Sequence, residues 1–568
     1  MSTHPRSVHL DRSDGVGAER QTGQVFIALR SSSRGVDCID FDENGEIGSV
    51  ELLALDDLPA RVREREPERP RWVWNDTSRW YPPLLAAGVR VERCVDLRLC
   101  HTILRNAAAT ASSALATAEP DAWDAPLAAR VGSTSDALFE LDPPPDDDDP
   151  VAEWKRQRDA VAGAADDGRL ALLLAAESVG ALVAAEMSFV GLPWSAELHD
   201  QVLVEILGPR VPNGRPARLE ALVARIRELL DAPALNPDSQ QDLLKALQNA
   251  GFRVESTSKW ELREIEHPAV EPLLEYKSLS RLLSANGWHW LEEWVRDGRF
   301  RPVYVPGGVV TGRWASDGGG ALQLPKQVRS AVVPDPGWKF VVADASQLEP
   351  RVLAAISGDR AMARAGQAAD MYQGMVDTGA VETRSQAKYG MLGAIYGGTA
   401  GESGRMRPRI EKAFPAAMAY VEAAARAGEH GDVVSTWLGR SSPPGRGLGY
   451  DETASEAEQR RTQQRAAAWG RFTRNFVVQG TAAEWALCWM GSLRRRLWGM
   501  GGGLLTDKPH LAFFLHDELL VHTPASLADE VADAMRESAA EAGRLLFGSV
   551  PVEFALSVAI VDRYSDAK

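Results

Sequence analysis

Two carboxylates leave apolar runs at places where a pair of acids could hold divalent cations. Asp344 ends the apolar stretch of "GWKFVVADAS", and Asp517 and Glu518 interrupt the two apolar arms of "HLAFFLHDELLVHTP". An unpaired carboxylate at the end of a buried strand is costly, so Asp344 needs a partner. Acids at the ends of adjacent strands can bind two divalent cations about 4 Å apart, which activate an attacking oxygen and stabilise a leaving oxygen on phosphorus. The alternatives are a helix N-cap for Asp344 and a solvated turn for Asp517.

A third stretch, "RSQAKYGMLGAIYGG" at 384–398, has the spacing of a helix with a chemically useful face. Arg384, Lys388, Leu392 and Tyr396 recur every four residues and therefore share one side of a helix. The two cations suit an anionic triphosphate on the first two turns, and the aromatic residue suits a base near the last turn. An ordinary helix with two exposed cations and a packed tyrosine is the alternative.

The elements expected around these residues form several units. Short strands are predicted within 23–54, around a turn at Asp42–Gly45. An acidic stretch rich in Ala and Pro that ends in "DPPPDDDDP" predicts a linker, followed by a connecting helix. Helical periodicity, strand-like segments, more helices and a hairpin follow in that order. The predicted boundaries are 1–105, 106–168, 169–300, 301–370, 371–470 and 471–568.

Length, charge and cysteine content exclude some classes of protein. A chain of 568 residues, 45% of them hydrophobic, is too long for one core. The net charge is -16, and because residues 1–150 are the more acidic part, the remainder has room for a locally basic cleft. Cys38, Cys94, Cys100 and Cys488 form no metal-ligand pattern and the N-terminus has no signal-peptide core, which indicates a reducing cytoplasm. We expect no membrane association, because no apolar run reaches the roughly 18 residues that span a bilayer.

Several motifs, taken in order, resemble those of the family A DNA polymerases, the group of bacterial DNA polymerase I. "DASQLEPR" resembles motif A, "RSQAKYGMLGAIYGG" resembles motif B on the fingers helix, and "HDE" at 516–518 resembles motif C. Further similar segments are "LLEYKSLSRL" of the thumb, "TGRWAS" at 311–316, "TWLGR" from Thr436 and "RFTRNFVVQGTAAEWA" from Arg471. The resemblance extends from about Leu170 to the C-terminus.

This resemblance implies a multidomain fold of the α/β and α+β classes. A right-hand polymerase, with an antiparallel sheet in the palm and helical fingers and thumb, would follow an RNase H-like α/β domain of the exonuclease type at 1–105. The thumb and the start of the polymerase domain would be 169–300, the palm 301–370 and 471–568, and the fingers 371–470. The resemblance leaves no room for the 5′ nuclease domain that many bacterial relatives carry.

By resemblance, the catalytic residues are three acids and one lysine. Asp344 and Asp517 would bind two Mg²⁺ ions, for which Mn²⁺ could substitute, and the backbone carbonyl of Ala345 would add a ligand. Glu518 would be an accessory acid. Lys388 would assist the departing pyrophosphate.

The resemblance also implies contacts with the nucleotide and the DNA. Arg384 and Lys388 would hold the triphosphate, and Glu349 would crowd the sugar 2′-position as a steric gate that favours deoxynucleotides. Arg313 and Gln479 would donate to the minor-groove edge, where a donor tests the shape of a base pair without reading its sequence. The remaining nucleotide-site residues would be Gln347, Leu392, Tyr396 and His516, and the remaining DNA contacts Arg471, Asn475 and Gly397.

Three positions near the gate depart from the family pattern. Ala345 and Pro350 stand where motif A usually has tyrosine and leucine. Leu392 stands where motif B usually has an aromatic ring that packs on the nucleotide sugar. Because the loss of this ring leaves Glu349 less constrained, we predict weaker rejection of ribonucleotides than family members typically show.

The N-terminal unit occupies the place of a 3′–5′ proofreading exonuclease but lacks the acids of its metal site. "VFIALRSS" has no Asp-x-Glu, and no Tyr-x3-Asp is found near "WKRQRDAVAG". Asn75 and Asp96 match the exonuclease pattern, whereas Arg79 falls where a metal-binding aspartate is expected. A cation would repel the metal ions, so we expect an inactive, degenerate domain kept for packing or interaction.

The resulting hypothesis is a template-directed DNA polymerase that extends primed template DNA with dNTPs in repair or gap filling. It would be a cytoplasmic, nucleoid-associated monomer. The alternative is a polymerase-fold protein that binds primed DNA with little synthesis, and Glu349 argues against an RNA-synthesising relative. The cations that could line a DNA cleft are Arg405, Arg407, Arg409, Lys412, Arg440, Arg471 and Arg474.

Overall fold

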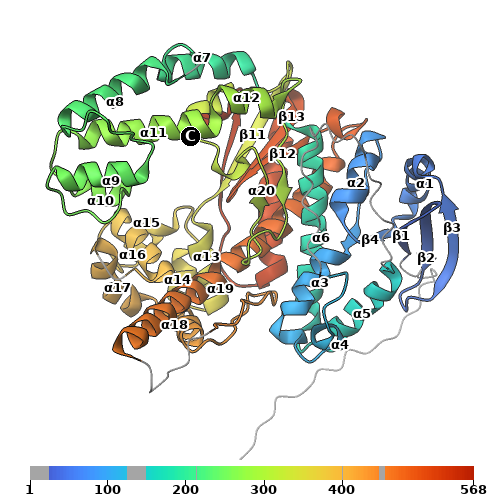
Figure 1. The fold of residues 1–568 in the computed structure, drawn as a ribbon. Coiled ribbons are helices and arrows are strands. Elements are labelled where there is room, and N and C mark those ends of the chain that lie inside the picture. Colours follow the sequence, from blue (N-terminus) through green and yellow to red (C-terminus); the bar gives the residue numbers. More distant parts are fainter. Residues whose placement is uncertain (1–24, 125–148, 213, 399–400, 447–454, 568) are drawn as a thin grey trace, which may run out of the picture.

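Two large β-sheets, each covered by helices, organise the molecule in the computed structural model (Figure 1). The structure describes residues 25–567 except 125–148, 213, 399–400 and 447–454. The N-terminal sheet lies at one end of the molecule. The second sheet lies near its centre, between helices that come from distant parts of the chain.

The N-terminal sheet has five strands in the order β3-β2-β1-β4-β5. The first three strands form an antiparallel meander, and β4 and β5 run parallel to β1. Both faces are covered: Ile27 and Leu29 belong to one core cluster, and Phe26 and Ala28 belong to another, as the alternation of side chains along a strand requires. The bounds are β1 (Phe26–Ser32), β2 (Gly35–Phe41), β3 (Ile47–Leu53), β4 (Arg71–Trp74), β5 (Cys94–Asp96), α1 (Leu58–Arg65), α2 (Thr77–Ala86) and α3 (Leu97–Asn106).

Part of the predicted linker is packed rather than extended. Residues 107–124 include the short helix α4 (Ala114–Thr117), and Leu115 and Trp123 are buried. Their apolar side chains explain the packing, because burying them removes apolar surface from water. Residues 125–148, with most of "DPPPDDDDP", lie outside the described residues. The connecting helix is α5 (Pro150–Ala162), capped by Asp149.

Helix α6 (Asp167–Val190) corrects one expectation from the sequence. Its mean hydropathy is 1.8 over 18 residues, so by length and composition it could cross a membrane. Two thirds of that segment is buried, however, and the helix packs against α2, β5 and α19 at the centre of the molecule (Figure 1). Such burial is typical of a core helix, because the helix is apolar on all sides and covered by protein.

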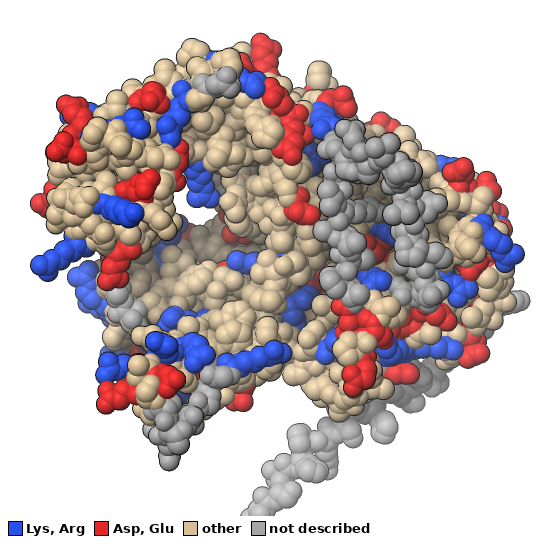
Figure 2. Space-filling model, in the orientation of Figure 1, with Lys and Arg blue, Asp and Glu red and all other residues tan. Residues whose placement is uncertain are grey.

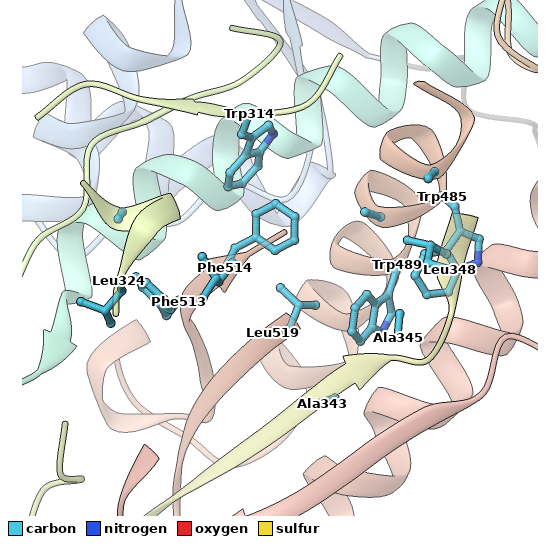
Figure 3. Packing of buried hydrophobic residues seen from close by; sticks show 14 of the residues in the cluster. Trp314, Leu324, Ala343, Ala345, Leu348, Trp485, Trp489, Phe513, Phe514 and Leu519 are labelled. Carbon is cyan, nitrogen blue, oxygen red and sulfur yellow. The ribbon is translucent and has the colours of Figure 1, made fainter. Parts of the chain in front are cut away.

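The central sheet is antiparallel, with strands in the order β12-β13-β11-β14. Its strands and covering helices are β11 (Trp338–Ala345), β12 (His510–Leu515), β13 (Glu518–Pro524), β14 (Leu556–Val561), α19 (Glu456–Trp498) and α20 (Ala528–Phe547). Figure 3 shows Trp485 and Trp489 of α19 packed beside Ala343 and Ala345 of β11, in one buried cluster with Leu519. The sheet and the long helix therefore share a core, which fixes the end of β11 relative to α19.

Two helical regions stand on either side of this sheet (Figure 1). The first contains α7 (Ala196–Leu207), α8 (Ala217–Leu229), α9 (Gln240–Asn249), α10 (Lys259–Arg263), α11 (Val270–Asn286) and α12 (Trp288–Trp294). The second contains α13 (Leu348–Ser357), α14 (Arg360–Ala365), α15 (Met371–Asp377), α16 (Arg384–Tyr396), α17 (Gly401–Ala413) and α18 (Pro415–Glu429). Short strands complete the fold: β6 (Leu192–Pro193), β7 (Val295–Arg296), β8 (Arg299–Phe300), β9 (Tyr304–Val305) and β10 (Ala315–Ser316).

A buried ion network joins the N-terminal domain to α6 and α19. Arg494 donates to both oxygens of Glu186, at 2.6 and 3.0 Å, and Arg90 donates to Glu186 at 3.1 Å. Tyr81 donates to the same carboxylate at 2.6 Å, and Arg494 also bonds the carbonyl of Val91. Burial by itself would raise the pKa of Glu186, but the charges of Arg494 and Arg90 outweigh it and lower the pKa. The carboxylate is therefore ionised and shared by two arginines.

Candidate active site

The tertiary structure brings Asp344 and Asp517 to the same end of the central sheet. β11 and β13 are antiparallel, and Asp344 lies directly opposite Glu518. β12 and β13 are joined by the two residues His516 and Asp517, and His516 has a left-handed φ of 60°, as tight hairpin turns require. The N–H of Ala345 donates to the carbonyl of Asp517 at 2.9 Å. The turn therefore lies against the last residues of β11, next to Asp344.

Glu518 is buried beside this pair and has partners of its own. Cross-strand residues that face each other project from the same side of a sheet, so Glu518 and Asp344 are neighbours. The hydroxyl of Tyr564 donates to Glu518, and Arg329 lies 3.5 Å from the carboxylate. The Arg329 guanidinium also lies over the Tyr564 ring. Glu518 is thus positioned close to the acids but is held by a phenol and a guanidinium.

Glu349, the expected gate, is held at both of its oxygens. Arg313 donates to Oε1, and the Tyr396 hydroxyl donates to Oε2 at 2.8 Å. Gln479 in turn donates to the Tyr396 hydroxyl at 3.3 Å. Burial, and then the charge of Glu349, raise the pKa of Tyr396, so this phenol keeps the proton that it donates. Four residues predicted from separate motifs are therefore connected in one hydrogen-bonded chain.

Helix α16 presents the predicted face to solvent. It begins at Arg384 after the N-cap Thr383 and ends at Tyr396, where Gly397 takes a left-handed φ of 74°. Arg384, Lys388 and Tyr396 are exposed and Leu392 is half-buried, so the four-residue spacing gives one open face, as predicted. Glycine suits the final position because a side chain there would be strained.

Two residues that sequence reasoning missed lie against Arg384. Asp370 accepts a hydrogen bond from Arg384 Nε, and the Arg384 guanidinium lies 5.7 Å from the centre of the Tyr372 ring. Asp370 also caps α15 by accepting from the N–H groups of Tyr372 and Gln373. The usable signal was an aspartate placed at the start of a helical pattern, but nothing local to 370–377 indicated a contact with α16.

The Arg384–Asp370 pair predicts a competition with the nucleotide. Asp370→Asn would retain the helix cap but remove the negative charge that holds Arg384. Because a half-exposed ion pair contributes about 1 kcal/mol or less, we expect the apparent KM for dNTP to fall by up to about fivefold. Steady-state extension of a primed template measures this KM. The matched control is Asp377→Asn on the same helix, and an unchanged KM in Asp370→Asn would show that no such competition exists.

Gln347 and Arg351 of motif A hold the backbone rather than facing the site. Gln347 has a left-handed φ of 52° before α13, and its side-chain oxygen accepts from the N–H of Met371. Arg351 is 1% exposed and donates to the carbonyls of five residues, Ser346, Gly366, Ala368, Ala369 and Glu553. These bonds connect the end of β11 to the loop before α15, so the two residues position Asp344, Glu349 and Asp370.

Three of the five predicted DNA contacts, Arg471, Asn475 and Gln479, lie along one stretch of α19. Arg471 is exposed, and its side chain passes close to Gly397. The side-chain oxygen of Asn475 is buried and has no hydrogen-bond partner in the part of the chain that the structure describes. Gln479 reaches Tyr396, and Arg313 is paired with Glu349 instead of being open to a minor groove. A buried oxygen without a donor is costly, so Asn475 is suited to receive a donor from a bound molecule.

A pocket of about 220 Å³ opens beside these residues. Arg313, Glu349, His516 and Asp517 line its polar side, and Trp314, Phe514 and Met490 line its apolar side. Figure 3 shows Trp314 and Phe514 next to each other above the sheet. The polar side and the apolar side of this pocket therefore meet at the end of the sheet where Asp517 lies.

Only some of the cations predicted to line a DNA cleft are not already paired with an acid among the described residues. Arg407, Arg409, Arg440 and Arg474 are engaged in ion pairs with glutamates. Arg405, Lys412 and Arg471 have no ion pair among the described residues. Figure 2 shows Lys and Arg side chains around the hollow between the two helical regions, with some Asp and Glu side chains among them.

The residues at the centre of the site fit hard divalent cations. Asp344 and Asp517 offer carboxylate oxygens, and backbone carbonyls lie beside them at the turn. Mg²⁺ prefers oxygen ligands and few protein carboxylates. The donor set therefore suits Mg²⁺ and Mn²⁺ better than the softer metals that thiolates bind.

Three residues of the N-terminal domain that were compared with an exonuclease site are engaged in hydrogen bonds. Arg79 on α2 donates to the hydroxyl of Ser31 on β1 at 2.8 Å. Asp96 caps α3 and accepts from the N–H of Thr77, and the side-chain oxygen of Asn75 accepts from Trp80. These three residues are occupied in bonds that hold β1, β4 and β5 to the neighbouring helices.

Comparison with known proteins identifies the family. Residues 213–564 match DNA polymerase family A. The chain is 30% identical over 331 residues to "DNA polymerase I, thermostable" of Thermus thermophilus, covering 54% of this chain and 37% of that protein. It is also 30% identical over 359 residues to the Thermus aquaticus protein of the same name, covering 56% of this chain and 41% of that protein. The chain thus spans less than half the length of either relative.

A solved structure shows the fold. The POL domain of Pol1 from M. smegmatis, in a complex with DNA primer-template and dNTP, has a TM-score of 0.67 and 17% identity, and the match covers 96% of this chain and 97% of that one. The predicted fold class is confirmed: a polymerase fold of the DNA polymerase I type follows an α/β domain with a mixed five-stranded sheet. Since the family match covers more than half of the chain, the protein belongs to DNA polymerase family A.

Proposed function

We propose that the chain is a template-directed DNA polymerase that adds deoxynucleotides to a primer 3′ end. The observation that carries this proposal is the meeting of Asp344 and Asp517 at one end of the sheet, next to Glu349. Arg384 and Lys388, on the exposed face of α16, are suited to hold a triphosphate. Tyr396 and Gln479 would meet the nascent base pair.

Divalent metal ions would complete this site. Asp344, Asp517 and the carbonyl of Ala345 would hold two Mg²⁺ ions, which neutralise charge on the attacking and leaving oxygens when bound. Lys388 would donate a proton or a hydrogen bond to the leaving pyrophosphate. Glu349 would orient the sugar, and Arg471 and Asn475 would hold the template and primer.

Primer extension on a defined template tests the proposal. We expect extension that requires Mg²⁺ or Mn²⁺ and is lost in Asp517→Ala. If the chain binds primed DNA but extends it no better than Asp517→Ala with either metal, it is the polymerase-fold DNA-binding protein of the alternative hypothesis.

Comparing extension across a one-nucleotide gap with extension on a long single-stranded template tests a role in repair or gap filling, for which we propose a preference for the gap. We further propose that the chain acts on nucleoid DNA as a monomer.

Ribonucleotide rejection depends on how firmly Glu349 is held. Because position 392 is a leucine, Glu349 is held by the hydrogen bonds from Arg313 and Tyr396. We predict that Leu392→Phe raises the preference for dNTP over rNTP, whereas Tyr396→Phe, which removes one hydrogen bond, lowers it about tenfold. Single-nucleotide incorporation with matched dNTP and rNTP measures the preference. The prediction would be contradicted if wild type preferred dNTP over rNTP as strongly as relatives with an aromatic residue at this position do, and if neither variant changed that preference.

We also propose that the 3′–5′ exonuclease activity is lost. The Arg79–Ser31 contact supports this, because a guanidinium in the position of a metal-binding acid repels cations. The test uses the Asp344→Asn variant, because its polymerase site cannot degrade the primer by reversing the polymerase reaction. We expect this variant to show no metal-dependent removal of a mismatched 3′ nucleotide. Degradation of the primer in this background, abolished by Asp96→Asn, would show an active exonuclease.

A further inference from the structure

A second pocket lies where the N-terminal sheet meets α5 and α6 (Figure 1). It has a volume of about 150 Å³ and is distant in sequence from every motif of the polymerase site. Arg71 at the start of β4 and Arg158 on α5 supply its charge, and Trp154 and Leu174 form apolar walls. Among the described residues, no carboxylate lines this pocket.

Both arginines lack an acidic partner. In the described part of the chain no hydrogen bond or ion pair reaches the Arg71 guanidinium, and its Nε is fully buried. Burial, and then repulsion from Arg93, lower the pKa of Arg71. Arg158 has no ion pair with a described residue, and its guanidinium carbon lies 5.0 Å from the centre of the Trp154 ring. Two cations therefore share a pocket in which no described acid compensates their charge, and because Arg71 is largely buried, its charge is costly there unless an anion is present.

The other polar groups around the pocket are already satisfied. Gln157 donates to the carbonyl of Leu97 and to Glu153. Ser178 donates to the carbonyl of Leu174 and accepts from the N–H of Asp96. Burial raises the pKa values of the Cys94 and Cys100 thiols, so both remain neutral. The unused hydrogen-bonding capacity of the pocket is thus that of two guanidinium groups.

We propose that this pocket binds a phosphate group, either as inorganic phosphate or as a phosphate monoester. A phosphate monoester carries a charge of about -1.5 to -2 at pH 7, which two guanidinium groups neutralise, whereas a carboxylate would leave one cation uncompensated. The planar donors of arginine match phosphate oxygens. The apolar walls have room for part of an attached organic group. This proposal is independent of the polymerase function.

Binding is tested with sodium phosphate, dAMP and an oligonucleotide carrying either a 5′-phosphate or a 5′-hydroxyl. Affinities are measured by isothermal titration calorimetry on the full chain. We expect at least one of the phosphate compounds to bind wild type at least about tenfold more tightly than it binds Arg71→Gln or Arg158→Gln. Arg158 is exposed, so its variant folds even if Arg71→Gln does not. Lys155→Gln, on the same helix but outside the pocket, is the matched control and should bind as wild type does.

A local readout separates this pocket from the triphosphate site on α16. The pocket is lined by residues of β4 and α5, so the ligand should slow amide hydrogen exchange in the peptides that contain these elements relative to the peptide that contains α16. Mass spectrometry of each peptide measures the rates. Protection by phosphate, by dAMP or by the 5′-phosphorylated end identifies which source the site takes. Equal affinities in all variants, or hydrogen exchange in the β4 and α5 peptides that none of the phosphate compounds slows, would overturn the proposal.

Discussion

Asp344→Asn and Asp517→Asn are each expected to reduce primer extension at least about a thousandfold. Each change removes one carboxylate charge from the pair at the end of β11 and the β12–β13 turn. The stabilisation that a bound metal ion gives to developing charge on phosphorus amounts to several kcal/mol, which corresponds to this factor. Single-turnover extension with saturating Mg²⁺ and dNTP measures the loss. Affinity for primed DNA, measured by fluorescence anisotropy, should be retained.

Asp562→Asn is the matched control for both variants. Asp562 pairs with Lys339 near the opposite end of the same sheet, at 2.6 Å, and is exposed. We expect this variant to extend a primer within about twofold of wild type, because an exposed pair contributes little. Extension by Asp344→Asn or Asp517→Asn within about tenfold of the control would mean that the two acids do not form the catalytic centre.

Glu186→Gln is expected to destabilise the protein more than Arg90→Met, a change in one of the two arginines that Glu186 binds. Removing the charge leaves Arg494 and Arg90 buried together without an acid, and breaking such a buried pair costs about 3–5 kcal/mol. Arg90→Met should cost less, because Glu186 then keeps both of its bonds to Arg494. Urea unfolding followed by circular dichroism measures the loss as a lower midpoint.

The control for this network is an exposed pair of the same chemistry. Glu228 pairs with Arg225 on α8, and both side chains are more than half exposed. Glu228→Gln should lower the free energy of unfolding by about 1 kcal/mol or less. If Glu186→Gln unfolds at the same urea concentration as Glu228→Gln, the network does not hold the N-terminal domain to the polymerase helices.

The features that the sequence predicted well are those that repeat along one element. The four-residue spacing of Arg384, Lys388, Leu392 and Tyr396 predicted that they share one side of a helix, and they do so in α16. The apolar arms around Asp517 predicted a hairpin, which β12 and β13 form. Local spacing succeeds because helices and strands have fixed periods, so that the side of each residue follows from its number.

The predictions that failed concerned how far one segment is covered by others. Residues 107–124 were treated as a linker, although Leu115 and Trp123 are buried. The cations of the cleft were overcounted, since Arg474 donates to the carbonyl of Ala394 and to Glu422. Burial and pairing depend on neighbours that are distant in sequence, and composition does not report them.

The motifs, their order and the sides of the elements on which they lie follow from the sequence alone, which also predicted the gate at Glu349. The folded chain was needed to show that Arg313 and Tyr396 hold Glu349, that Asp370 holds Arg384, and that Arg71 and Arg158 share a pocket without an acid. The physical reason is that hydrogen bonds and ion pairs act over a few ångströms in space. Their partners here come from different elements, so no spacing along the chain encodes them.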